Sequence, residues 1–226
     1  PTPEKTSVMA PFILMLFLYF IVGLFTVINQ QFQVPLKSAL LPHDGNMTNA
    51  LVTLLNFSWF LAYPFSEGFA TRWVDRLGYR KTSVYSLLIF IVGLGFYEAA
   101  VLLHIYAPSY ITIMGNPIFT GFFVFLSGSF VIGMAVTILQ VVTGLYLDVN
   151  PVGKTTPLQR QMIGGTTNSI GMAIGPLVVS YIIFYGIPLH NVQSREFIWP
   201  VICLIAIICI FTLITARIKM PAINVA

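Results

Sequence analysis

The chain has 226 residues, of which 57% are hydrophobic and only 8% are charged, and its mean hydropathy is +0.88. Soluble domains carry about 25% charged residues, so this composition excludes an ordinary soluble fold and makes lipid part of the solvent. The formal net charge is +4, but the basic residues lie at the ends of apolar runs, which is typical of membrane topology rather than of a nucleic-acid-binding face.

Six apolar runs follow one another along the chain, separated by short segments that contain Pro, Gly or charged residues. A helix needs about 20 mostly apolar residues to cross a bilayer, and each run reaches that length. The sequence therefore predicts an all-α membrane protein with six transmembrane helices in one domain, residues 1–226. Pro35 predicts a kink near the far end of the first helix. The predicted helices cover approximately residues 8–41, 48–71, 82–103, 118–147, 160–185 and 197–216.

The basic residues are distributed unevenly over the two sides that six crossings define. With the N-terminus inside, the inner segments hold nine of the eleven Lys and Arg residues, and the stretch Arg72–Thr82 alone holds four. Because cytoplasmic loops are enriched in these residues, the bias predicts a multi-pass inner or plasma membrane protein with both termini cytoplasmic. The nine are Lys5, Arg72, Arg76, Arg80, Lys81, Lys154, Arg160, Arg217 and Lys219, and the other two are Lys37 and Arg195.

Motifs of soluble enzymes and metal sites are missing from the sequence. Gly153-Lys154-Thr155 resembles the end of a phosphate-binding loop, but the earlier glycine of that motif falls on Asp148. The three histidines, His43, His104 and His190, lie in separate loops and show no metal-ligand spacing. We therefore expect no catalytic residues, no metal and no other cofactor.

Polar residues within the apolar runs are costly in lipid, so each should face a cavity or another helix. At 100° per residue, amides and small residues share one face in three of the helices. Two interpretations remain open: an aqueous cavity that recognises a neutral polyhydroxy solute, or close packing between helices. We favour the cavity for Gln30, Gln33 and Gln140, and packing for the glycines of the fifth helix. The face of the first helix consists of Thr26, Gln30, Gln33 and Lys37, with Asn29 beside it. The face of the fourth helix consists of Gly133, Thr137, Gln140 and Gly144. The face of the fifth helix consists of Gln161, Gly164, Gly165, Asn168, Gly171 and Gly175.

Glu67 and Glu98 are the only acidic residues well inside the predicted helices. A buried carboxylate can take up and release a proton as its surroundings change. Equally, Glu67 can pair with the basic residues of the nearby inner loop, and Glu98 can face the outer interface or Lys37. Both carboxylates are therefore candidates for ion coupling, with a structural role as the alternative.

The loop Asp75-Arg76-Leu77-Gly78-Tyr79-Arg80-Lys81 resembles the signature loop of the major facilitator superfamily, G-x-x-x-D-R-x-G-R-R-K. Thr71 stands in place of the leading glycine, and Tyr79 in place of the first basic residue. The resemblance implies that the chain is one six-helix half of a transporter, built from two inverted three-helix repeats and completed by a second six-helix domain. It also implies a charged gate on the cytoplasmic side, formed by Asp75, Arg76, Gly78, Arg80 and Lys81.

A narrower resemblance links the chain to the fucose–galactose–glucose:proton symporter group. Arg160 and the stretch Asn168-Ser169-x-Gly171 are similar to the group's R-x-N-x-x-Q-x-x-N-S-x-G sequence. The two acids that this group uses in proton coupling and sugar binding correspond to Gln31 and Gln140 here. An amide keeps the hydrogen bonds of an acid but cannot titrate, so proton coupling would require Glu67 or Glu98.

Together these features predict transport of a small polar solute, sugar-like by resemblance, by alternating access across a lipid bilayer. The expected solute contacts are Gln30, Gln31, Gln33, Gln140 and Asn168. The alternative is a non-transporting six-helix membrane component of a larger complex, which would co-purify with a stoichiometric partner and show no flux.

Overall fold

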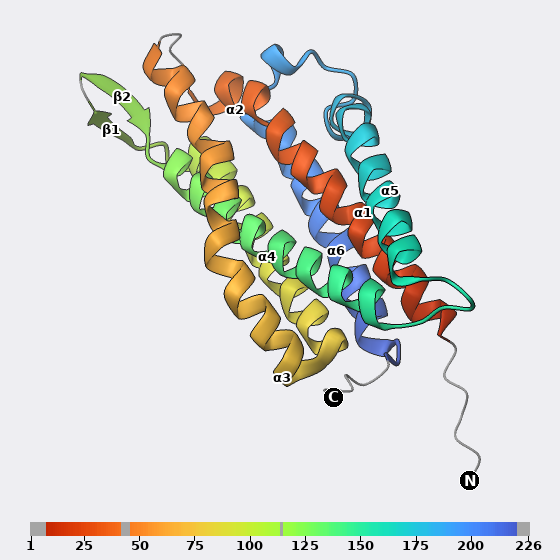
Figure 1. Cartoon of the computed structure of the whole chain (residues 1–226). Coiled ribbons are helices and arrows are strands. Elements are labelled where there is room, and N and C mark those ends of the chain that lie inside the picture. Colours follow the sequence, from red (N-terminus) through yellow and green to blue (C-terminus); the bar gives the residue numbers. More distant parts are fainter. Residues whose placement is uncertain (1–7, 42–45, 114, 221–226) are drawn as a thin grey trace.

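The computed structural model describes residues 8–41, 46–113 and 115–220 of the chain. Over this part the chain is a bundle of long helices, joined at one end by a single two-stranded hairpin (Figure 1). Five helices are long and apolar enough to cross a membrane, which confirms the all-α membrane class. The main helices are α1 (Met9–Gln31), α3 (Asn46–Tyr106), α4 (Gly121–Val149), α5 (Pro157–Leu177) and α6 (Ile198–Arg217).

The helix α3 contains two arms rather than one continuous rod. Its 61 residues would span about 90 Å if straight, roughly three times the thickness of a bilayer's hydrocarbon core. The backbone is non-helical at Gly78, where φ is 79° and ψ is 167°, a region open essentially to glycine alone. The chain reverses there, and Figure 1 shows the first arm (residues 46–77) and the second arm (residues 79–106) side by side.

The two arms correspond to the predicted second and third helices, but the predicted loop between them is wrong. The stretch Arg72–Thr82 is helical on both sides of Gly78 instead of forming an extended loop. Arginine and lysine, four of which lie in this stretch, are good helix formers, so the arms continue beyond the apolar runs and the chain turns at the glycine.

The first predicted helix is broken, as Pro35 indicated, although the break lies three residues earlier. The helix α1 ends at Gln31, and α2 (Gln33–Leu40) begins after Phe32. Proline has no backbone N–H and its ring crowds the carbonyl four residues before it. The carbonyl of Gln31 therefore loses its normal partner, which places the break at Phe32.

The connection between α3 and α4 forms a β-hairpin. The strands β1 (Tyr110–Ile113) and β2 (Asn116–Phe119) pair as an antiparallel hairpin, with Ile111 opposite Ile118. Gly115 has φ of 81°, a value that suits the tight turn of such a hairpin. The residues of the two strands include Tyr, Ile, Thr and Phe, which fit a pleated surface well.

The last two helices lie where the sequence predicted them, with small differences at their ends. Thr156 and Gln159 form a capping box that starts α5 at Pro157, three residues before the predicted start. The helix continues as a π-helix η1 (Val178–Ile183), and α6 is preceded by two single turns. These turns are η2 (Leu189–Asn191) and η3 (Ser194–Phe197).

Glycines allow the helices to approach closely at their crossings. A Cβ atom at Gly133 of α4 would meet the carbonyl of Trp59 in the first arm. A Cβ at Gly171 of α5 would meet the carbonyl of Phe20 in α1. The Gly171 contact agrees with the packing interpretation of the fifth-helix glycines, and Gly133 allows a similar close approach in α4.

The two ends of the bundle differ in the segments that they carry. Figure 1 places the start of α1, the Gly78 turn, the α4–α5 connection and the end of α6 together at one end. The helix α2, the start of α3 and the β-hairpin lie at the opposite end. We refer to these as the Gly78 end and the hairpin end.

Candidate functional site

A groove of about 350 Å³ opens between α1, the first arm of α3 and α4, and we call it the inner groove. It brings together Glu67 and Gln140, two of the residues singled out from the sequence. Glycine at position 144 leaves open space, because no atom lies within 4 Å of where a Cβ would be. The groove is lined by Tyr19, Glu67, Thr137, Gln140, Val141, Gly144 and Leu145.

Hydrogen-bonding groups from three helices face this groove. Gln140 is half-buried, Glu67 is exposed, and Tyr19 is half-buried on the facing surface of α1. The hydroxyl of Thr137 donates to the Gly133 carbonyl at 2.8 Å, so its remaining capacity is that of an acceptor. One carboxylate, one amide, one phenol and one hydroxyl therefore offer both donors and acceptors to a bound molecule.

The polar surface continues from the inner groove along α1. Tyr63, on the first arm, lies beside Thr26 and within electrostatic reach of Glu67 and Tyr19. Neither tyrosine was singled out in the sequence, where aromatic residues are numerous and most pack in the core. Tyr63 lies four residues, about one helical turn, before Glu67, and this spacing is the sequence signal that points to it.

Two amides of the predicted sites take part in helix packing instead. The side chain of Asn168 donates to the Tyr19 carbonyl at 3.0 Å and lies against Gly23. The side chain of Gln161 donates to the Gly144 carbonyl at 2.8 Å. Asn168 lines neither pocket described here, and its contact supports the packing interpretation at this position.

A second pocket, of about 680 Å³, lies at the hairpin end, and we call it the outer pocket. It contains Gln33 and Lys37 of the predicted polar face of the first helix, whereas no residue of that face lines the inner groove. Gln30 is exposed and Gln31 is half-buried, and neither lines either pocket. The outer pocket is lined by Gln33, Val34, Lys37, Ser38, Leu41, Asn49, Val52, Thr53 and His190.

Asn29 is the centre of a buried hydrogen-bond network that joins α1, both arms of α3 and α4. Its carbonyl oxygen accepts from Tyr97 at 3.2 Å and from Ser129 at 3.0 Å. Its amide nitrogen donates to the side chain of Asn56 at 3.2 Å. Only 2% of Asn29 is exposed, so this residue stabilises the helix crossing and does not contact a solute.

Arg160 locks the connection between α4 and α5. Its Nε donates to the Leu147 carbonyl at 2.6 Å, and its two terminal nitrogens donate to the carbonyls of Thr155 and Asp148 at 2.8 and 2.7 Å. The guanidinium thereby satisfies carbonyls at the C-terminal end of α4, where the helix dipole also favours a cation. In the sequence, Arg160 was noted as an inner basic residue and through the family resemblance.

The residues expected to form the gate lie at the Gly78 turn. Asp75, Arg76, Arg80 and Lys81 are all exposed. Gly78 provides the reversal itself. The turn is anchored by the buried Tyr79, whose ring meets that of Tyr146 edge-on at a centroid distance of 5.3 Å.

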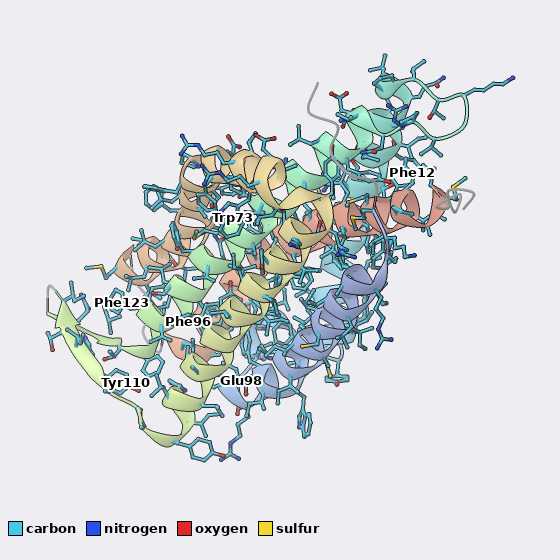
Figure 2. The ribbon with its side chains drawn as sticks, turned by 90° about the horizontal axis from the view of Figure 1, so that it is seen from below. Phe12, Trp73, Phe96, Glu98, Tyr110 and Phe123 are labelled. Atoms are coloured by element: carbon cyan, nitrogen blue, oxygen red, sulfur yellow. The ribbon has the colours of Figure 1, made fainter. Side chains whose placement is uncertain are left out.

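Glu67 and Glu98 lie at different depths and do not form a pair. Glu67 is 11 residues before the Gly78 reversal and Glu98 is 20 residues after it, which corresponds to depths of about 16 and 30 Å at 1.5 Å per residue. Figure 2 shows Glu98 well separated from Trp73, which lies near the turn. One carboxylate oxygen of Glu98 is buried without a hydrogen-bond partner among the described residues.

The inner groove can hold a small polar molecule, but it has no nucleophile paired with a base. Among the described residues, no group of three or more His, Cys, Asp or Glu side chains is placed to hold a metal ion. No known protein family, curated protein or solved structure matches this chain.

Proposed function

We propose that this chain is the solute-binding six-helix half of an alternating-access membrane transporter. The observation that carries the proposal is the inner groove, where Tyr19, Glu67 and Gln140 from three different helices face one open space. Polar side chains in an otherwise apolar bundle are costly, and in membrane proteins they mark solute or ion pathways. The groove volume of about 350 Å³ lies within the range of small-molecule sites.

The chemistry of the groove favours a neutral polyhydroxy solute such as a hexose. A sugar hydroxyl both donates and accepts, which matches the amide of Gln140, the phenol of Tyr19 and the carboxylate of Glu67. Among the described lining residues there is no basic side chain to recognise an anion. The group resemblance at Gln140 leads to the same class of solute.

The groove forms one wall of the proposed pathway. Alternating access requires an opposing wall that rocks against it, and in transporters built from repeats a second six-helix domain supplies it. We place the Gly78 end on the cytoplasmic side, because eight of the basic residues of the predicted inner segments lie in described parts of the chain that gather there. Asp75, Arg76, Gly78, Arg80 and Lys81 would then act as a gate between the two domains.

Uptake by the full-length protein tests this proposal. We expect proteoliposomes to accumulate labelled L-fucose, D-galactose or D-glucose under an imposed proton gradient, and Gln140→Ala to lower the affinity or rate. Loss of one hydrogen bond to the solute corresponds to about 1 kcal/mol, or roughly fivefold in affinity. Ser127→Ala is the matched control, since Ser127 lies on the same helix, is exposed and bonds only to the Phe123 carbonyl.

Two outcomes contradict the proposal. Absence of uptake of all three sugars would overturn the sugar assignment, and unchanged transport by Gln140→Ala would overturn the groove assignment. Co-purification of a stoichiometric partner without any flux would favour the non-transporting membrane component.

A further inference from the structure

The outer pocket lies at the end of the bundle opposite the Gly78 turn, and of its lining residues only Gln33 was expected from the sequence to contact a solute. We propose that it is a second binding site for the same class of neutral polyhydroxy solute, occupied before the solute moves to the inner groove. The proposal rests on the transport function proposed above.

The walls of the outer pocket are held together by contacts between segments far apart in the sequence. The hydroxyl of Ser38 in α2 donates to the His190 carbonyl in η2 at 2.6 Å. Next to it, Ser194 donates to the Ala39 carbonyl at 2.9 Å and lies 2.8 Å from Nδ1 of His104 on the second arm. These contacts hold α2 against the connection before α6, and Ser38 and His190 of these two segments line the pocket.

The lining of the outer pocket combines apolar side chains with groups that can bond to sugar hydroxyls. Leu41 and Val52 are buried and supply the apolar contacts. Gln33 and Asn49 each offer an amide donor and acceptor. The hydroxyl of Thr53 donates to the Asn49 backbone carbonyl at 2.9 Å and therefore faces a ligand as an acceptor.

The outer pocket is separate from the inner groove in both position and chemistry. Gln33 is 14 residues after Tyr19, which corresponds to about 21 Å along the helix axis and exceeds the length of a hexose. The described lining of the outer pocket contains the basic residue Lys37 and no carboxylate, whereas the inner groove contains Glu67 and no basic residue. The ammonium group of Lys37 offers donors that a sugar hydroxyl can accept. The outer pocket is also about twice as large, at 680 against 350 Å³, so we expect looser selection among sugars there.

Protection of a cysteine from labelling tests the inference. The full-length protein, with Cys203→Ser and Cys209→Ser, receives Thr53→Cys and is labelled in nanodiscs by a hydrophilic maleimide. L-fucose, D-galactose and D-glucose are the probes. Occupancy should slow labelling by the factor 1 + [L]/Kd, which is about tenfold at ten times Kd. Asn49→Cys serves as a second reporter in the same pocket.

The matched control is Tyr106→Cys, because Tyr106 is 79% exposed at the same end and lines neither pocket. We expect no protection there, and we expect protection of Thr53→Cys to persist unchanged when Gln140→Ala is added. The inference is overturned if no sugar protects either reporter. It is also overturned if Tyr106→Cys is protected equally, or if Gln140→Ala abolishes the protection.

A third reporter, Gln140→Cys in the inner groove, distinguishes failure of this inference from failure of the proposed function. Protection of Gln140→Cys without protection at Thr53 or Asn49 supports the inner groove and rejects the second site. Protection at Thr53 in a protein that transports none of the sugars supports the outer site and rejects the transport proposal.

Discussion

At the scale of single residues, the structure separates polar groups that stabilise the bundle from groups that face open space. Arg160 and Asn29 are both almost fully buried, and their side chains hydrogen-bond to residues of neighbouring helices. Gln140 and Glu67 are more accessible and face the inner groove. Substitution in the first pair should therefore affect stability, and substitution in the second pair should affect transport.

Arg160→Ala should destabilise the protein because three backbone carbonyls lose a charged donor. Hydrogen bonds to charged groups contribute about 1.5–3 kcal/mol each, but water can partly replace the donor at the bundle end, so we expect a loss of about 3 kcal/mol. Thermal unfolding of the purified protein measures the effect. Lys154→Ala in the same connection is the control, since Lys154 is exposed, and equal unfolding temperatures for the two variants would contradict the role of Arg160.

At the scale of elements, Gly78 has a conformational role that is separate from gating. Its φ of 79° and ψ of 167° lie in a region where a side chain costs about 1–3 kcal/mol. Gly78→Ala should therefore lower the unfolding temperature. Gly95→Ala on the second arm is the control: its Cβ would meet no atom within 4 Å, and alanine is favoured in a helix by about 1 kcal/mol. A stability loss in both variants would reject the turn explanation.

The positions of the helices were predictable from the sequence because their cause is local. A continuous apolar run forms a helix in lipid, so the segments came out close to their observed ends. Pro35 signalled a break because the lost N–H is a property of the residue itself. The turn at Gly78 was harder to locate, since the charged residues around it are compatible with either loop or helix.

Which amides pack against another helix and which face a groove was not predictable, because it depends on which helices contact each other. Asn168 and Gln140 have the same hydrogen-bonding groups, yet one contacts the α1 backbone and the other faces the groove. The helical angle of 100° per residue places Asn29 beside the polar face of α1, but the crossing of α1 with α3 and α4 buries it. The outer pocket requires His190 and Thr53, which are 137 residues apart and share no local pattern.

At the scale of the whole molecule, the arrangement of the ends predicts accessibility from the two sides of the membrane. In the cysteine-free background, Lys81→Cys lies at the Gly78 end and Tyr106→Cys at the hairpin end, and both positions are exposed. In sealed right-side-out vesicles an impermeant maleimide should label Tyr106→Cys only, and permeabilisation should add Lys81→Cys. Labelling of Lys81→Cys in sealed vesicles would reverse the proposed orientation.

Energy coupling also belongs to this scale, because it links the protonation of one residue to movement of the whole domain. Glu67 lines the inner groove together with Gln140, whereas Glu98 lines none of the pockets described here. If a proton drives transport, the carboxylate beside the solute is the one whose charge both the solute and the opposing domain can influence. Glu67 is therefore our choice for coupling.

Glu67→Gln keeps the hydrogen-bonding shape of the side chain but removes its ability to titrate. We expect this variant to exchange labelled hexose across proteoliposomes at equal concentrations, and to lose accumulation driven by a proton gradient. Glu98→Gln is the matched control and should retain both activities. Gradient-driven accumulation by Glu67→Gln at the wild-type level would remove Glu67 from the coupling mechanism, and loss of accumulation in Glu98→Gln alone would transfer that role to the second arm of α3.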